Sequence, residues 1–326
     1  MSTLDRLGVG DRVRVGAETL LDPETERDRE RRRIAALAVP FLALATFGAL
    51  VPLAVMVRAS VSTSNFTLEG FSLVAYQRLF ASMLAAVPVL GDAVAADAVY
   101  GRVVWNSLWF GAVTTVASVA LGVGIAHGLE KYDLPAEGWL VTLISFPISL
   151  PGIVAAFMMI VLFGRTGVLT NFFAVLSGAE PGGLALTGQP SGTVLAVLGL
   201  FFGYLYSMIP RATFLLRGSY AEVNTAAEEA ARSLGATPWQ TFRYVTLPQI
   251  RAGIVGALIL TFRTALAIFG TVLVLKALSV VTFRFDQEIK VGWNLATASA
   301  LATLFFLFTL AFTFLGLRWT SAEVSA

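Results

Sequence analysis

The sequence predicts an all-α, polytopic membrane protein with about six transmembrane helices. Of its 326 residues, 56% are hydrophobic and only 13% are charged, whereas soluble globular chains contain about 45–50% apolar and about 25% charged residues. The mean hydropathy of +0.77 is an average over the whole chain, so one signal peptide or one anchor cannot account for the apolar excess. Several bilayer-spanning helices are therefore required.

Apolar runs of the length needed to cross the hydrocarbon core, about 20 residues of helix, recur along the chain. They cover residues 34–57, 105–128, 139–163, 193–210, 252–275 and 294–317. The charged head before the first run mixes acidic and basic residues, unlike the short basic start of a secretory signal. We therefore expect a polar extension over residues 1–33, a transmembrane domain over residues 34–317 and a short tail over residues 318–326.

The arginines and lysines favour a multi-pass topology in a cell membrane with both termini in the cytoplasm, because basic residues concentrate in cytoplasmic segments. The charged head contributes most of this bias, and outside the head the two sides carry equal numbers. In this topology residues 58–103 form a long extracytoplasmic segment. Residues 211–251 form a cytoplasmic loop between the fourth and fifth runs.

Two features inside the runs are candidates for a translocation path. Pro147, Pro151 and Gly152 interrupt the third run, and such breaks are tolerated at membrane depth where the freed backbone groups are buried in protein or line a cavity. They form either part of a gate or a kink that improves packing. Arg263 is the one charge well inside a run, and it either lines a translocation path or ties the fifth helix to its neighbour.

The loop between the fourth and fifth runs predicts two short helices joined by a sharp turn. Thr225 with Glu228, and Thr237 with Gln240, have the spacing of a capping box at a helix start. Gly235 lies between them, where a left-handed backbone conformation costs glycine little. Short alanine-rich helices are marginal in water by themselves. We therefore expect them to lie against a partner protein or to pack back on the membrane helices.

This loop resembles the EAA loop of binding-protein-dependent ATP-binding-cassette importer permeases. The pattern of that family is EAA, three residues, Gly, nine residues, Ile, one residue and Leu-Pro, and valine replaces the isoleucine in this chain. The matching positions are Glu229, Ala230, Ala231, Gly235, Val245, Leu247 and Pro248. The resemblance covers roughly residues 100–317, and it does not extend to the head or to residues 58–100.

The resemblance implies an importer-permease fold in which the EAA helix is a coupling helix. Glu229 would contact the surface of a cytoplasmic ATPase, Gly235 would permit the turn, and Ala230 and Ala231 would form a close-packed face. The implied partners are an ATP-binding-cassette ATPase dimer, a second permease copy or homologue, an extracytoplasmic solute-binding protein and the lipid bilayer. We expect no nucleic-acid partner, no metal and no cofactor.

The stretch from Phe163 to Gly167, FGRTG, follows the third run. It resembles an FGRxG stretch in the polyamine, ferric-iron, thiamine and phosphonate branch of these permeases. That similarity implies one of these four solutes as the cargo. The long segment over residues 58–103 also favours this branch, in which two different permeases usually pair.

Other classes of function fit the composition less well. The chain has no cysteine and one histidine, and none of its lysines, Lys131, Lys276 and Lys290, follows the glycines of a phosphate-binding loop. The runs contain no Asp or Glu, which argues against an intramembrane enzyme and against an ion-coupled transporter. We expect a chain that is not an enzyme and whose ATP is hydrolysed by a partner. A secondary transporter or channel independent of ATP is the alternative.

Overall fold

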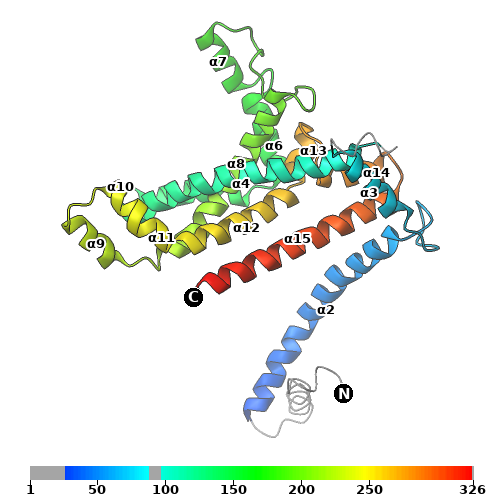
Figure 1. Ribbon diagram of the computed structural model, residues 1–326, viewed down its shortest axis with the longest axis horizontal. Helices are drawn as coiled ribbons and strands as arrows, with labels where there is room; N and C mark the ends of the chain where they lie inside the picture. Colours follow the sequence, from blue (N-terminus) through cyan, green and yellow to red (C-terminus); the bar gives the residue numbers. More distant parts are fainter. Residues whose placement is uncertain (1–25, 88–96, 325–326) are drawn as a thin grey trace. The chain divides into compact units, whose positions relative to one another are not determined.

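A computed structural model describes residues 26–87 and 97–324, and within these residues every regular element is a helix (Figure 1). The chain divides into two compact units, residues 1–58 and residues 59–326. The described part of the first unit, residues 26–58, lies in helix α2 (Glu26–Ser60). The described part of this helix begins at Glu26, eight residues before the expected first run, and the charged residues between Glu26 and Ile34 belong to the same helix.

The second unit contains a series of helices in a bundle. The long ones are α4 (Val99–Lys131), α8 (Val194–Tyr220), α12 (Arg251–Ala267) and α15 (Leu295–Val324). The shorter ones are α3 (Val74–Ala85), α5 (Glu137–Ser149), α6 (Gly152–Phe163), α7 (Val168–Ser177), α9 (Thr225–Ser233), α10 (Pro238–Thr241), the π-helical turn η3 (Phe242–Thr246), α11 (Leu247–Gln249), α13 (Gly270–Leu275) and α14 (Val281–Lys290).

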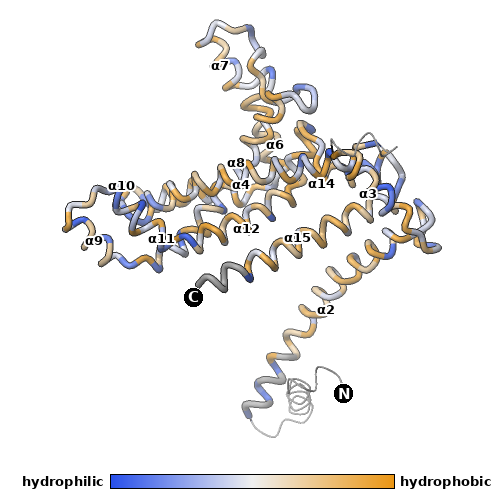
Figure 2. Tube along the Cα trace, viewed as in Figure 1, coloured by the Kyte–Doolittle hydropathy of each residue, from blue (hydrophilic) through white to orange (hydrophobic). Residues whose placement is uncertain are grey.

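The fold class predicted from the sequence is confirmed. Among the described residues, the stretches that are long and apolar enough to cross a membrane are Ala36–Ser60, Val99–Lys131, Gly152–Ser177, Val194–Tyr220 and Leu295–Arg318. A sixth crossing forms if Pro238–Gln249 and Arg251–Ala267, which meet at a bend of 68°, act as one broken span. Figure 2 shows apolar residues along most of α4, α8 and α12 and along the coloured part of α15.

Three expected boundaries differ from the structure. The third run is divided at Pro151 into α5 and α6, and the long apolar stretch begins only at Gly152. The fourth run does not end at Pro210, since α8 continues to Tyr220; a proline is tolerated in such a helix because neighbouring groups replace the lost hydrogen bond. The fifth run is divided at Ile268 into α12 and α13.

The core lies where α8 packs along α4 and α12. Tyr204 and Phe110 meet edge to face with ring centres 5.0 Å apart, and Leu200 and Met208 are fully buried beside them. A second apolar cluster lies toward the end of α8 that leads into α9, and it includes Ala126, Leu216, Tyr220 and Ile250. This second cluster fixes the point from which the segment over residues 224–250, called the EAA segment below, extends (Figure 1).

Close contact between α4 and α8 depends on a glycine, which gives a prediction with an internal control. A Cβ atom at Gly122 would lie 3.0 Å from the Cβ of Ala212 and 3.1 Å from the backbone nitrogen of Thr213, whereas one at Gly124 would meet nothing within 4 Å. Gly122→Leu is therefore expected to destabilise the bundle by about 1–3 kcal/mol or more through overpacking. Thermal unfolding of the purified protein should show a lower midpoint for Gly122→Leu than for Gly124→Leu, and equal midpoints would contradict this packing.

Candidate functional site

The EAA segment folds as the expected helix, turn and helix. Helix α9 ends at Ser233, the chain turns at Gly235 with a φ of +89°, and α10 begins at Pro238. The left-handed backbone at Gly235 is strained for residues with a side chain. Within the turn, the Gly235 and Ala236 N–H groups donate to the carbonyls of Arg232 and Ala231 at 2.9 and 3.0 Å, which satisfies carbonyls at the end of α9.

One of the two expected capping boxes is present, and the prediction of the other was wrong. The Thr237 hydroxyl accepts from the Gln240 N–H at 3.3 Å, and the Gln240 side chain accepts from the Thr237 N–H at 2.8 Å. At the start of α9, however, the capping residue is Asn224, whose Oδ1 accepts from the Ala227 N–H at 3.3 Å. Glu228 is not available for a capping box, because other partners hold its carboxylate.

Those partners fix α9 to the end of α4. The Lys131 ammonium donates to Oε2 of Glu228 at 2.7 Å, and the Thr246 hydroxyl donates to Oε1. The Lys131 and Glu228 side chains are only 10% and 6% exposed. Burial raises the pKa of Glu228, but the hydrogen bonds from Lys131 and Thr246 and the charges of Lys131 and Arg232 outweigh it. The pKa is therefore below its ordinary value, and the carboxylate is ionised at neutral pH.

Aromatic rings provide a second attachment between α4 and the EAA segment. The His127 ring lies edge-on to Phe242 with ring centres 4.8 Å apart, and it also contacts Tyr132 and Tyr220. The hydroxyl of Tyr220 and Nδ1 of His127 are hydrogen-bonded at 3.3 Å. His127 thus joins α4, α8 and η3 at one end of the bundle.

The motif residues on the other side of α9 face outward. Glu229 and Ala230 are exposed, while Ala231 is half-buried. Three large side chains next to them are also exposed, namely Leu234 (90%), Trp239 (67%) and Tyr244 (71%). Adjacent glutamates therefore have opposite surroundings, since Glu228 is buried against Lys131 and Glu229 is left open. The outer side of the segment combines a carboxylate, small residues and apolar side chains.

The second half of the motif connects this surface to α12. Val245 and Leu247 are half-buried, Leu247 packs on the cluster around Ile250, and Pro248 is exposed. The chain passes through the π-helical turn η3 before Pro248 and bends by 68° between α11 and α12. Turns of the π type occur frequently at functional sites. The Gln249 side chain returns to the start of α9, accepting from the Asn224 N–H at 2.8 Å.

A charged cluster ties the neighbouring helices together at the same end. Arg217, near the end of α8, donates to Glu130 of α4 at 2.5 Å and lies 3.7 Å from Glu137 at the start of α5. Neither this cluster nor the Lys131–Glu228 pair was predicted from the sequence. Both join residues that are far apart in the chain, and only the three-dimensional arrangement brings them together.

The expected break between α5 and α6 lies against a second break, between α12 and α13, that was not expected. Pro147 is buried inside α5, whereas Pro151 precedes the first residue of α6. The Gly152 carbonyl accepts from the Thr271 hydroxyl at 3.2 Å, and a Cβ at Gly270 would be 2.9 Å from the Ile153 nitrogen. The break between α5 and α6 thus packs on the break between α12 and α13. The geometry suits a hinge or a rigid kink equally.

The FGRxG stretch forms a tight turn directly after α6. The Phe163 carbonyl accepts from the N–H groups of Leu186 and Thr187 at 2.9 and 3.2 Å. A Cβ at Gly164 would collide with the carbonyl oxygen of Ile160, and one at Gly167 would lie 2.6 Å from that of Leu162. Both glycines are therefore needed for the close approach of the backbone, which gives this stretch a structural role.

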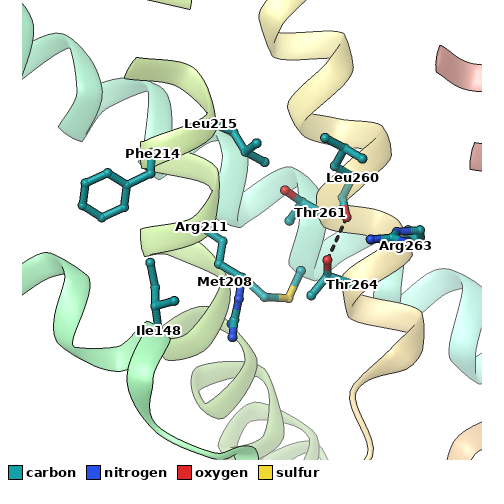
Figure 3. Close-up of a pocket in the computed structure, with 9 residues that line it drawn as sticks. All are labelled: Ile148, Met208, Arg211, Phe214, Leu215, Leu260, Thr261, Arg263 and Thr264. Atoms are coloured by element: carbon teal, nitrogen blue, oxygen red, sulfur yellow. Dashed lines mark hydrogen bonds between the residues drawn. The ribbon is translucent and has the colours of Figure 1, made fainter. Parts of the chain in front are cut away.

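Arg263 lines a pocket of about 450 Å³ between α8 and α12, together with Arg211 of α8 (Figure 3). Within the described part of the chain, no hydrogen bond or ion pair joins the side chain of Arg263 to another residue. Among the described residues, the Arg211 side chain donates only to the carbonyl and the hydroxyl of Ser207, one turn earlier in the same helix. The Arg263 side chain thus makes no ion pair or hydrogen bond to a neighbouring helix among the described residues, and its role on a translocation path stays a prediction.

Comparison with known families identifies the class of the chain. The family described as "Binding-protein-dependent transport system inner membrane component" matches residues 118–320, which are more than half of the chain. The chain belongs to this family. The matched range includes the EAA segment, so the resemblance noted from the spacing around Glu229 is confirmed. The protein is therefore a multi-pass membrane component of a transport system.

Individual relatives support the same class. The sulfate transport system permease protein CysW of Synechococcus elongatus is 29% identical over 170 residues, which are 52% of this chain and 55% of that protein. The thiamine transport system permease protein ThiP of Salmonella typhimurium is 28% identical over 229 residues, which are 69% of this chain and 41% of that protein. The match thus spans about half the length, or less, of these two relatives.

A solved structure shares the fold. A chain of a bacterial ABC transporter involved in the import of the acidic polysaccharide alginate matches with a TM-score of 0.72 at 14% identity, covering 90% of this chain and 96% of that chain. At this identity the match establishes the architecture alone. The importer-permease fold expected from the sequence is confirmed.

Proposed function

We propose that this chain is the transmembrane permease subunit of an ATP-binding-cassette importer, and that the EAA segment couples it to a separate cytoplasmic ATPase. The observation on which this proposal depends is the two-sided environment of α9. Glu228 on its inner side is held by Lys131 and Thr246, while Glu229 and Ala230 on its outer side are exposed beside Leu234 and Trp239. An exposed surface with apolar side chains indicates a protein partner.

The attachments of α9 supply a physical route for coupling. The Lys131–Glu228 pair links α9 to α4, and the π-helical turn with Leu247 and Ile250 links the segment to α12. A force applied to the outer side of α9 therefore reaches two spanning helices through buried contacts. Gly235 allows the sharp turn that presents Glu229, with Ala230 and Ala231 forming the close-packed face toward the ATPase.

The complete importer would contain a second permease copy or homologue, an ATPase dimer and an extracytoplasmic solute-binding protein. In this arrangement both termini and the EAA segment lie on the cytoplasmic side. ATP binding closes the ATPase dimer and moves the two coupling helices together. The spans then open outward to accept the solute. The helix breaks at Pro151 and Ile268, together with the nearby Pro147, form the candidate gate, and Arg263 lies on the path. In support, a solved structure with this fold is an alginate transporter in complex with a periplasmic protein that holds alginate.

Copurification tests the coupling contact. The wild-type chain, extracted in mild detergent from its native membrane, is expected to bring with it a protein that contains a phosphate-binding loop, detected by mass spectrometry. Glu229→Lys should reduce the recovered ATPase by about tenfold or more, because it places a positive charge at the centre of the contact. Glu180→Lys is the matched control, since Glu180 is an exposed glutamate outside the EAA segment.

A second set of outcomes would contradict the proposed contact with the ATPase. If the wild-type chain is recovered folded but without any ATPase, under conditions in which other membrane complexes stay intact, the importer proposal fails. A secondary transporter or channel independent of ATP would then take its place. Equal recovery of the ATPase with Glu229→Lys and Glu180→Lys would show that Glu229 is not part of the contact with the ATPase.

A further inference from the structure

The pocket between α8 and α12 has an unusual balance of charge for a site among membrane-spanning helices. Its volume is about 450 Å³, and its polar lining residues are Arg211, Thr261, Arg263 and Thr264. Ile148 of α5 and apolar side chains of α8 and α12 are the other lining residues, and none of the described residues in the lining is acidic. Figure 3 shows Arg211 extending from α8 and Arg263 from the facing α12.

Neither guanidinium is neutralised by a carboxylate in the described part of the chain. The Arg211 guanidinium reaches only Ser207, and the exposed side chain of Arg263 forms no ion pair or hydrogen bond with any described residue. Arginines within spanning helices normally pair with an opposite charge, with backbone carbonyls or with water in a cavity, because an uncompensated charge there is costly. A pocket lined by two cations and no described carboxylate favours an anionic occupant over a cationic one.

A third group in the same pocket lacks a hydrogen-bond partner. Thr261 is 3% exposed, and its hydroxyl oxygen is buried without a hydrogen bond to any described group. The hydroxyl of Thr264, by contrast, donates to the Leu260 carbonyl at 2.9 Å (Figure 3). Buried hydroxyl groups in folded proteins nearly always have a partner. Thr261 is therefore an unused donor in the wall of a pocket that already carries two unpaired cations.

We propose that this pocket binds an anionic group rich in oxygen, with Arg211 and Arg263 as charged donors and Thr261 as a neutral donor. A guanidinium presents a planar set of N–H groups that matches two oxygens of a carboxylate, sulfate or phosphate group. The volume lies within the range of sites for small molecules, about 300–1,000 Å³. The occupant is either the anionic part of a transported solute or the phosphate of a lipid headgroup.

If the occupant is a transported solute, this inference rests on the proposed importer function and narrows the class of solute that is imported. Two unpaired arginines would repel a polyamine or any other cation that enters the pocket. An anionic cargo is therefore favoured over a polyamine among the solutes implied by the FGRxG stretch. If the solute is the occupant, the pocket is a point on its path through the bundle.

Binding of radiolabelled sulfate, with phosphate as competitor, tests the site directly. The full chain is placed in nanodiscs of phosphatidylcholine, and chloride keeps the ionic strength constant. We expect saturable binding by the wild type that Arg211→Gln and Arg263→Gln each weaken about tenfold or more, with a smaller loss for Thr261→Val. Arg165→Gln, which changes an exposed arginine elsewhere, should bind like the wild type.

A second arm separates the two sources of the anion. In nanodiscs that contain phosphatidylglycerol, a lipid occupant would displace the sulfate bound by the wild type, whereas sulfate binding that persists in the wild type supports the solute. The absence of saturable sulfate or phosphate binding, or equal binding by all variants, would overturn the site. The assay needs no ATPase, so a failure here leaves the coupling proposal standing, and loss of the ATPase contact leaves this site intact.

Discussion

Replacing Lys131 with glutamate is expected to free α9 from the bundle and to cause the largest single loss of coupling. The substitution places two carboxylates in a buried position where the wild type has an ion pair of 2.7 Å. Removing one partner of a buried pair costs about 3–5 kcal/mol, because the other charge stays buried and unpaired. Hydrogen–deuterium exchange should show faster exchange over residues 225–233, and copurification should show most of the ATPase lost.

The exchanged pair provides the matched control. Lys131→Glu combined with Glu228→Lys restores opposite charges at the same two positions, and the Thr246 hydroxyl can accept from the new ammonium as well as donate. Compared with Lys131→Glu alone, the double variant is expected to show slower hydrogen–deuterium exchange in α9 and partial recovery of the ATPase. If the single and double variants behave alike, the pair does not hold α9 in place.

Gly235→Val is expected to disrupt coupling without unfolding the spans. The backbone at Gly235 has a φ of +89°, and its surroundings leave open space for a side chain. The effect is therefore one of backbone conformation, which costs about 1–2 kcal/mol for a residue with a Cβ and more for a β-branched one. The turn between α9 and α10 would relax, displacing Glu229, and ATPase recovery should fall at least about tenfold.

Gly178→Val separates this effect from general strain. Gly178 ends α7 with a φ of +68°, and a Cβ added there would likewise meet no atom within 4 Å. Both variants should therefore lose similar thermal stability, while only Gly235→Val loses the ATPase. Equal ATPase recovery in the two variants would show that the turn at Gly235 has no special part in coupling.

Features that depend on local sequence could be predicted. The apolar runs place the long helices, because length and hydropathy alone decide which segments can cross a bilayer. The spacing from Glu229 to Pro248 identifies the EAA segment, and the cap at Thr237 follows from residues three positions apart. Each of these depends on neighbours in the chain, so no knowledge of the packing is needed.

Features that depend on packing could not be predicted. Pro210 looks like a helix end in the sequence, yet α8 continues past it because neighbouring helices support the span. The capping box assigned to Thr225 fails because Glu228 meets Lys131, a residue 97 positions away. In the same way, Arg211 and Arg263 share a pocket only after α8 and α12 have come together. Long-range pairing of polar groups leaves no periodic pattern in the sequence.

Site-specific photocrosslinking from the outer side of α9 tests the central claim most directly. A photoreactive amino acid replaces Ala230, which is exposed in the motif, and in a control it replaces Phe173, which is exposed on α7. After irradiation of intact cells, we predict that position 230 crosslinks to a protein with a phosphate-binding loop and that position 173 does not. Efficient expression and membrane insertion without any such crosslink at position 230 would contradict the assignment of α9 as the coupling helix.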